Sequence, residues 1–104
     1  METSEKRQRG RPRAFNGPSE ANSVQSLDRA LRILAIVAEG SGLSLSEISA
    51  QSGLAASTAY RMLTTLENHG MVEFDGTDQL WSIGGETYRM GAAFLRRRKL
   101  GDRA

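Results

Sequence analysis

Residues 45–66 constrain the fold more than any other part of the chain, because two helical patterns meet there at a glycine. Ser44 and Glu47 have the spacing of a capping box, in which each side chain satisfies a backbone N–H at a helix N-terminus. Gly53 follows at the position where a helix commonly ends in a left-handed residue. The pattern therefore predicts a helix, a tight turn and a second helix.

The second helix of this segment begins with Ser57 and Thr58 and has an apolar face and a polar face. The residues expected to be buried on the apolar face are Ala59, Met62, Leu63 and Leu66. A rotation of about 100° per residue places four polar side chains on the opposite face: Ser57, Arg61, Thr64 and Asn68. Short hydrogen-bonding side chains with one arginine suit a helix that lies in the major groove of DNA.

A longer helix is predicted before this segment. From Val24 onward apolar residues recur at helical spacing, with Ser26 as the expected N-cap and Gly40 beyond the end. The residues expected on its apolar stripe are Leu27, Ala30, Leu31, Ile33, Leu34, Val37 and Ala38. Such a stripe is typical of a helix that packs on a core.

After Gly70 the period of the apolar residues becomes that of a strand. Two short runs of strand formers flank a hairpin turn signal over residues 75–78, Asp-Gly-Thr-Asp. The residues expected to be buried in this hairpin are Val72, Phe74, Trp81 and Ile83. From Glu86 a last amphipathic helix is expected to pack against a second copy of the chain. Its candidate dimer residues are Tyr88, Met90, Phe94 and Leu95.

The order helix, helix, helix, strand, strand predicts a mainly α fold with a small β-hairpin, which is the winged helix-turn-helix plan. We expect three parts within the 104 residues. Residues 1–23 form a disordered basic arm, residues 24–85 the winged helix-turn-helix domain and residues 86–104 a linker or dimerisation helix.

The formal net charge of +2 conceals an uneven distribution. Residues 1–14 carry five basic and two acidic side chains, and residues 96–104 carry five basic and one acidic. Residues 24–95 carry four basic and eight acidic side chains. The attraction for phosphate is therefore expected to lie mainly in the two tails.

The sequence Arg9-Gly10-Arg11-Pro12-Arg13 matches the core of an AT-hook. In such a motif glycine lets the backbone enter a narrow minor groove, proline keeps it extended and the arginines lie along the groove floor. The alternative is a basic tail that only raises the non-specific affinity for DNA.

Composition argues against several other classes of protein. The chain has no cysteine, no secretion signal and no apolar run near the ~20 residues that span a bilayer, so we expect a cytoplasmic protein that does not contact a membrane. His69 is the sole histidine and has no partner at ligand or catalytic-triad spacing. We therefore expect no enzyme activity, no metal site and no cofactor.

Three segments resemble the IclR-type transcriptional regulators: residues 24–34, residues 53–63 and residues 66–84. They are similar to the family's first helix, the start of its recognition helix and its wing. The resemblance implies a one-component regulator that binds palindromic promoter sites in double-stranded DNA as a homodimer or a dimer of dimers, and represses or activates transcription. It also implies a C-terminal domain for a small-molecule effector. Because that domain is absent, we expect the chain to be a fragment.

Two departures from the family pattern bear on the DNA contact. Ala55 and Ala56 stand where the family often has a proline and a basic residue, which removes one phosphate contact. Asp75 and Asp78 make the wing tip acidic, so we expect a weaker wing contact than in members with a basic tip.

The candidate DNA-binding residues of the recognition helix are Ser57, Thr58, Tyr60, Arg61 and Thr64. Arg61 is the best single candidate, because arginine can donate to guanine O6 and N7 together. Its alternative role is a surface charge that pairs with Glu67 or another nearby acid. The hydroxyl groups could equally be plain polar surface, and Tyr60 could be half-buried with its hydroxyl outward.

Two other functions are open from the sequence. A winged helix can bind protein through its acidic body, with tails that only increase solubility. Alternatively, the basic arm alone could make the chain a non-specific architectural DNA binder.

Overall fold

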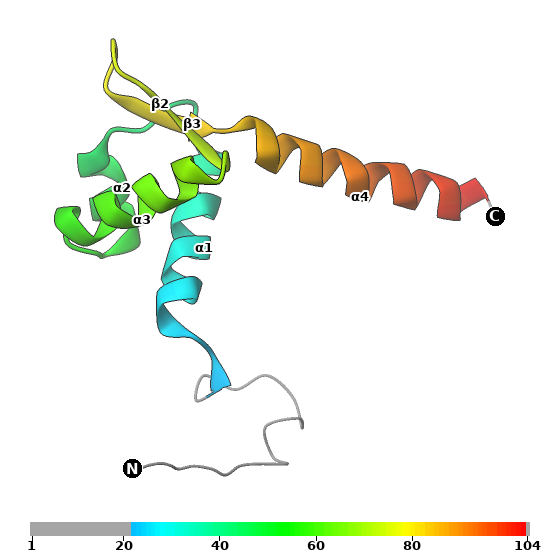
Figure 1. The fold of residues 1–104 in the computed structure, drawn as a ribbon, viewed down its shortest axis with the longest axis horizontal. Helices are drawn as coiled ribbons and strands as arrows, with labels where there is room; N and C mark the ends of the chain where they lie inside the picture. Colours follow the sequence, from blue (N-terminus) through cyan, green and yellow to red (C-terminus); the bar gives the residue numbers. More distant parts are fainter. Residues whose placement is uncertain (1–21, 104) are drawn as a thin grey trace.

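The computed structural model describes residues 22–103, with side chains up to Arg98. In this part of the chain, four helices and a two-stranded antiparallel hairpin follow one another (Figure 1). The elements are α1 (Gln25–Glu39), α2 (Leu45–Ser52), α3 (Ala56–Asn68), β2 (Val72–Asp75), β3 (Leu80–Ile83) and α4 (Gly85–Arg103). The predicted mainly α winged helix-turn-helix is confirmed. The arm motif at residues 9–13 lies outside the described residues.

α1 begins directly after Val24, so the prediction of Ser26 as its N-cap is wrong. Val24 has an extended backbone, and its carbonyl oxygen already accepts a hydrogen bond from the N–H of Asp28 at 3.0 Å. The first helical hydrogen bond therefore forms before Ser26, which lies inside the first turn.

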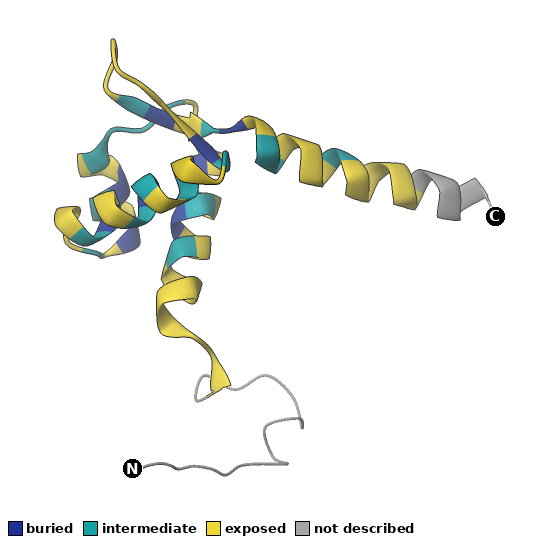
Figure 2. Cartoon of the chain, in the orientation of Figure 1, coloured by how far each residue is buried: buried dark blue, intermediate teal, exposed yellow. Residues whose placement is uncertain are grey.

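The predicted apolar stripe of α1 is only partly buried. Ile33 and Val37, in the C-terminal half, are fully buried. Leu27 and Leu31 are 55% and 52% exposed. The N-terminal half of α1 extends beyond α2 and α3 and is exposed except at Ala30, which is half-buried (Figure 2). The expectation of burial is therefore wrong for Leu27, Leu31 and also Ala38.

The turn from α2 to α3 forms as predicted. The Ser44 hydroxyl accepts a hydrogen bond from the N–H of Glu47 at 3.2 Å, and the Glu47 carboxylate accepts one from the N–H of Ser44 at 2.8 Å. Gly53 follows α2 with a φ of 76°, in the left-handed region. The Ser49 hydroxyl then donates to the carbonyl oxygen of Leu54 at 2.6 Å, which ties α2 to the turn.

α3 begins one residue earlier than predicted, and its N-cap residue, Ala55, makes no side-chain cap hydrogen bond. Ala59 and Leu63 are fully buried, as expected. Met62 and Leu66 are half-buried, because both line a groove between α3 and the exposed half of α1.

In the hairpin, Val72 lies opposite Ile83 and Phe74 opposite Trp81. Leu43 and Trp81 exchange two backbone hydrogen bonds, of 3.0 and 2.7 Å, so the loop before α2 pairs with the free side of β3. Val72 and Trp81 are buried and Ile83 is half-buried. Phe74 is 37% exposed, contrary to expectation. It packs on the ring of Trp81, with centroids 4.7 Å apart, rather than among the helices.

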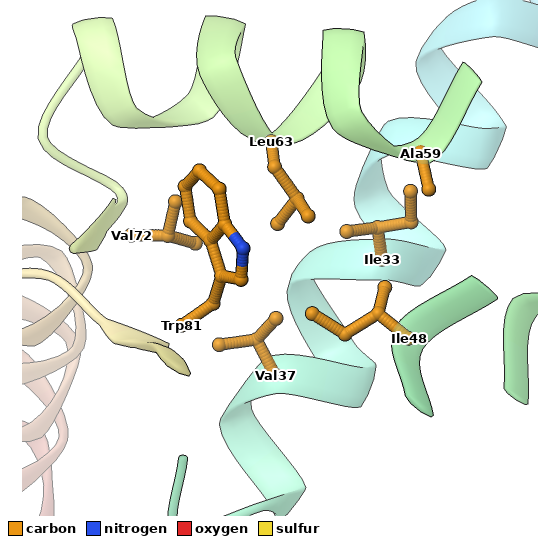
Figure 3. Packing of buried hydrophobic residues seen from close by; sticks show 7 residues of the cluster. All are labelled: Ile33, Val37, Ile48, Ala59, Leu63, Val72 and Trp81. Atoms are coloured by element: carbon orange, nitrogen blue, oxygen red, sulfur yellow. The ribbon is translucent and has the colours of Figure 1, made fainter. Parts of the chain in front are cut away.

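One hydrophobic core joins the first three helices to the hairpin. Its fully or almost fully buried residues are Ile33, Val37, Ile48, Ala59, Leu63, Val72 and Trp81 (Figure 3). Every element from α1 to β3 contributes at least one of them. The position of α3 is therefore determined by contacts with all of its neighbours.

The first turn of α4 is hydrogen-bonded to the loop that follows α3. The carbonyl oxygen of Met71 accepts hydrogen bonds from the N–H of Gly84 and from the hydroxyl of Thr87, both at 2.8 Å. The carbonyl oxygen of Gly70 accepts one from the N–H of Glu86 at 3.0 Å. Beyond this turn α4 extends away from the other elements (Figure 1). The direction of α4 therefore depends on the close contact between residues 70–71 and residues 84–87.

Replacing Gly84 by alanine is expected to lower the free energy of unfolding by about 1–3 kcal/mol. Gly84 is buried, and an added Cβ would overlap the carbonyl oxygen of Gly70. Chemical denaturation followed by Trp81 fluorescence measures the change. Gly85→Ala is the matched control, because an added Cβ there meets no atom within 4 Å. Equal stability of the two variants would contradict the close contact.

Candidate nucleic-acid interface

The polar face of α3 is held outward by the core beneath it. Ala59 and Leu63 are fully buried, which sets the rotation of α3 about its axis. On the opposite side Ser57 and Arg61 are exposed and Thr64 is half-buried. The structure thus brings three of the five predicted residues onto one outward face.

Arg61 is available to a ligand. Within residues 22–98 neither Arg61 nor Glu67 makes an ion pair, so the pairing that the sequence left open is not formed. In the same part of the chain an ion pair does join Arg89 to Glu86 on α4, with 2.9 Å between nitrogen and oxygen. The hydrogen bond from Arg89 lowers the pKa of the Glu86 carboxyl below its ordinary value.

The hydroxyl groups of α3 differ in their hydrogen bonding. Thr64 Oγ1 donates to the carbonyl oxygen of Tyr60 at 2.9 Å, and Thr65 Oγ1 donates to that of Arg61 at 3.0 Å. Both bonds run back one turn within the helix, as is common for threonine. Ser57, in the first turn, is exposed and makes no such bond in the described structure.

The other two predicted residues lie on the flanks of α3. Tyr60 lies on the wing side, where its ring meets the edge of the Trp81 ring at 6.4 Å between centroids. It is 53% exposed, so the half-buried position that the sequence left open is not formed. Thr58 is half-buried on the other flank, where it lines a groove together with Leu27 and Met62.

The wing tip is acidic. Asp75 ends β2, and its carboxylate accepts a hydrogen bond from the N–H of Thr77 at 2.9 Å, which helps to close the turn. Gln79 completes the turn in a left-handed conformation, with a φ of 61°. Asp78 is exposed, and residues 71–84 contain no basic side chain. The wing therefore offers phosphate no charge attraction.

Two apolar surfaces are uncovered in the described structure. The predicted dimer residues of α4 are exposed: Tyr88 by 74%, Met90 by 59%, Phe94 by 52% and Leu95 by 66%. The large exposed apolar residues at the N-terminal end of α1 are Leu27, Leu31 and the N-cap residue Val24. A groove lined in part by Leu27 and Met90 connects the two surfaces. Sequence reasoning missed the α1 surface, because periodicity shows which residues share a face but not which neighbour covers it.

The described part of the chain contains no group of three or more histidine, cysteine, aspartate or glutamate side chains placed to hold a metal ion. None of its helices is long and apolar enough to cross a membrane. The outward face of α3, with Ser57, Arg61 and Thr64, is the feature on which the functional assignment depends.

The fold and this face define the class of protein: a winged helix-turn-helix DNA-binding domain, with α3 as the recognition helix and the β2–β3 hairpin as the wing. A family model described as the IclR helix-turn-helix domain matches residues 26–76. The chain belongs to the IclR family of transcriptional regulators.

Known proteins agree with this assignment. The chain is 43% identical over 101 residues to the HTH-type transcriptional regulator BhcR of Paracoccus denitrificans, and 39% identical over 93 residues to the transcriptional repressor IclR of Escherichia coli. These matches cover 94% and 88% of this chain but 36% and 34% of the relatives, so the chain spans about a third of their length. The crystal structure of Pseudomonas aeruginosa HmgR superimposes with a TM-score of 0.66 at 34% identity, over 70% of this chain and 30% of that one.

Proposed function

We propose that this chain binds double-stranded DNA in a sequence-specific manner, as the DNA-binding part of a transcriptional regulator. The observation that carries the proposal is Arg61, which is exposed and has no ion-pair partner within residues 22–98. In the major groove an arginine can donate two hydrogen bonds to one guanine. Ser57 and Thr64 share its face of α3 and supply hydroxyl groups to adjacent bases or phosphates.

The flanks of α3 contact the DNA backbone in this proposal. Tyr60 and Thr58 lie at the two edges of the outward face and reach phosphate or sugar oxygens there. Ala55 provides no side-chain cap, so the first N–H groups of α3 are available to a phosphate. The acidic wing tip contributes little, because Asp75 and Asp78 repel phosphate.

Much of the affinity is assigned to the two basic tails. Residues 24–95 carry a net charge of −4, whereas residues 1–14 carry +3 and residues 96–104 carry +4. We assign the arm motif Arg9-Gly10-Arg11-Pro12-Arg13 to the minor groove beside the site bound by α3. The ten residues between this motif and Val24 can span ~30 Å, which reaches a neighbouring groove.

The proposal includes a homodimer. An exposed apolar face on a long helix is unfavourable in water, and a second copy of α4 would cover it, together with the exposed half of α1. Two copies related by a two-fold axis present two recognition helices to the half-sites of a palindrome, and two such dimers could bind together.

The rest of the regulator is assigned by analogy with the longer relatives. A small-molecule effector would bind a part of the protein outside this chain and would repress or activate transcription through the linker helix. Promoter DNA of bacteria lies in the cytoplasm, where this function places the protein.

Arg61→Ala is expected to weaken binding to a selected duplex by about 1–3 kcal/mol and to change binding to random DNA little. The reason is that Arg61 contacts a base, whereas the tails contact any phosphate. Fluorescence anisotropy with labelled duplexes at fixed salt measures both affinities. Arg32→Ala makes the same change of charge on α1 and should affect neither. Equal, weak binding of both duplexes by the wild type would favour a protein-interaction module instead.

Deleting residues 1–14 is expected to preserve the choice of sequence and to reduce the dependence of affinity on salt, because fewer counterions are released. Titrations at several salt concentrations measure this slope. If the deletion abolishes all binding, the chain is an architectural binder that depends on the arm.

A second variant separates the two roles of the arm. Replacing Arg9, Arg11 and Arg13 together by lysine preserves the charge but not the guanidinium groups. Affinity for AT-rich flanks should fall in this variant if the arm lies in the minor groove. Affinity equal to that of the wild type would mean that the arm contributes only non-specific charge attraction.

Phe94→Asp is expected to convert a dimer into a monomer, because it places a charge in the proposed contact between α4 helices. Sedimentation equilibrium at micromolar concentration measures the change in mass. Ala93→Asp is the matched control, since it adds the same charge to an exposed neighbouring position of α4. A wild-type chain that is monomeric at every concentration would contradict dimerisation through this helix.

A further inference from the structure

The hydroxyl proton of Thr64 is already used within the protein. A carbonyl oxygen only accepts hydrogen bonds, so the 2.9 Å bond between Thr64 Oγ1 and the carbonyl oxygen of Tyr60 is one that the hydroxyl donates. A hydroxyl group has one proton and two acceptor lone pairs. Thr64 therefore presents an acceptor to a partner on the outward face of α3.

Arg61, about one helical turn before Thr64, has the opposite polarity. Its guanidinium group carries five donors and no acceptor, and it has no ion-pair partner within residues 22–98. Three residues along a helix correspond to about 4.5 Å. Stacked base pairs are about 3.4 Å apart. The two side chains are thus placed to contact bases that are one or two steps apart.

The four bases differ in the polarity of the exocyclic group that they show in the major groove. Adenine and cytosine carry amino groups that donate, whereas guanine O6 and thymine O4 only accept. An amino group can donate to Thr64 while the bond to Tyr60 is kept, and bonds in such a chain strengthen one another. A keto oxygen would need the hydroxyl proton, and the bond to Tyr60 would be lost.

We infer that Thr64 determines specificity by selecting an amino base, adenine or cytosine, over a keto base. The selected base lies one or two steps from the base that Arg61 contacts. The inference rests on the proposed function, because it needs α3 to lie in the major groove. Thr65 offers an internal comparison: its hydroxyl makes the equivalent bond, at 3.0 Å to the carbonyl oxygen of Arg61, and it is exposed on the other side of Arg61, about 100° around the helix from Thr64.

Selection of bound duplexes from a random pool, followed by competition binding, tests the inference. Thr64→Val removes the hydroxyl and keeps the shape, Thr64→Ser keeps the hydroxyl, and Thr65→Val is the matched control. The wild type and Thr64→Ser should favour adenine or cytosine about two- to tenfold at one position. Thr64→Val should lose that preference and no other, and Thr65→Val should retain the preference at that position.

Two results would overturn the role of Thr64: preferences that are unchanged in Thr64→Val, or a wild-type preference for guanine or thymine at the position that this variant alters. If Arg61→Ala changes one position while Thr64→Val changes none, the proposed function stands and the inference fails. A wild-type chain that selects no sequence at all would overturn both.

Discussion

The packing of Trp81 holds the hairpin against the helices, and the placement of the recognition helix depends on it. Its backbone pairs with Leu43 on one side and with Phe74 on the other. Trp81 is 3% exposed, and its ring lies beside Leu63 in the core (Figure 3). Tyr60 meets the edge of the same ring. One aromatic residue thus connects the wing to α3 and to the loop that precedes α2.

In the proposed function, the choice of a DNA site and the strength of binding come from different parts of the chain. The core holds α3 with its polar face outward, but that helix contributes a single positive charge, on Arg61. The folded part is acidic overall, and the basic side chains gather in the tails. In the proposed function, the rigid face of α3 therefore selects the sequence, while charge that is independent of sequence supplies much of the affinity.

Features that depend on neighbours in the chain are predictable from the sequence. The capping box of Ser44 and Glu47 and the left-handed Gly53 involve groups within four residues of one another, so local spacing is sufficient. The cap of α1 is not predictable in this way, because the carbonyl oxygen of Val24 begins the helix without any side-chain signal. The exposure of Leu27 is not predictable either, because it depends on how far α2 and α3, which are distant in the sequence, extend along α1.

The sequence by itself determined the order of the elements and the residues that share each face, because helical and strand periods are local properties of the chain. It therefore placed Ser57, Arg61 and Thr64 together on α3 before any tertiary contact was known. Only the tertiary structure decided that Arg61 has no ion-pair partner within residues 22–98. It also decided the direction in which α4 extends after the contact at Gly84. These properties depend on which groups come together in space, and the period of apolar residues carries no information about that.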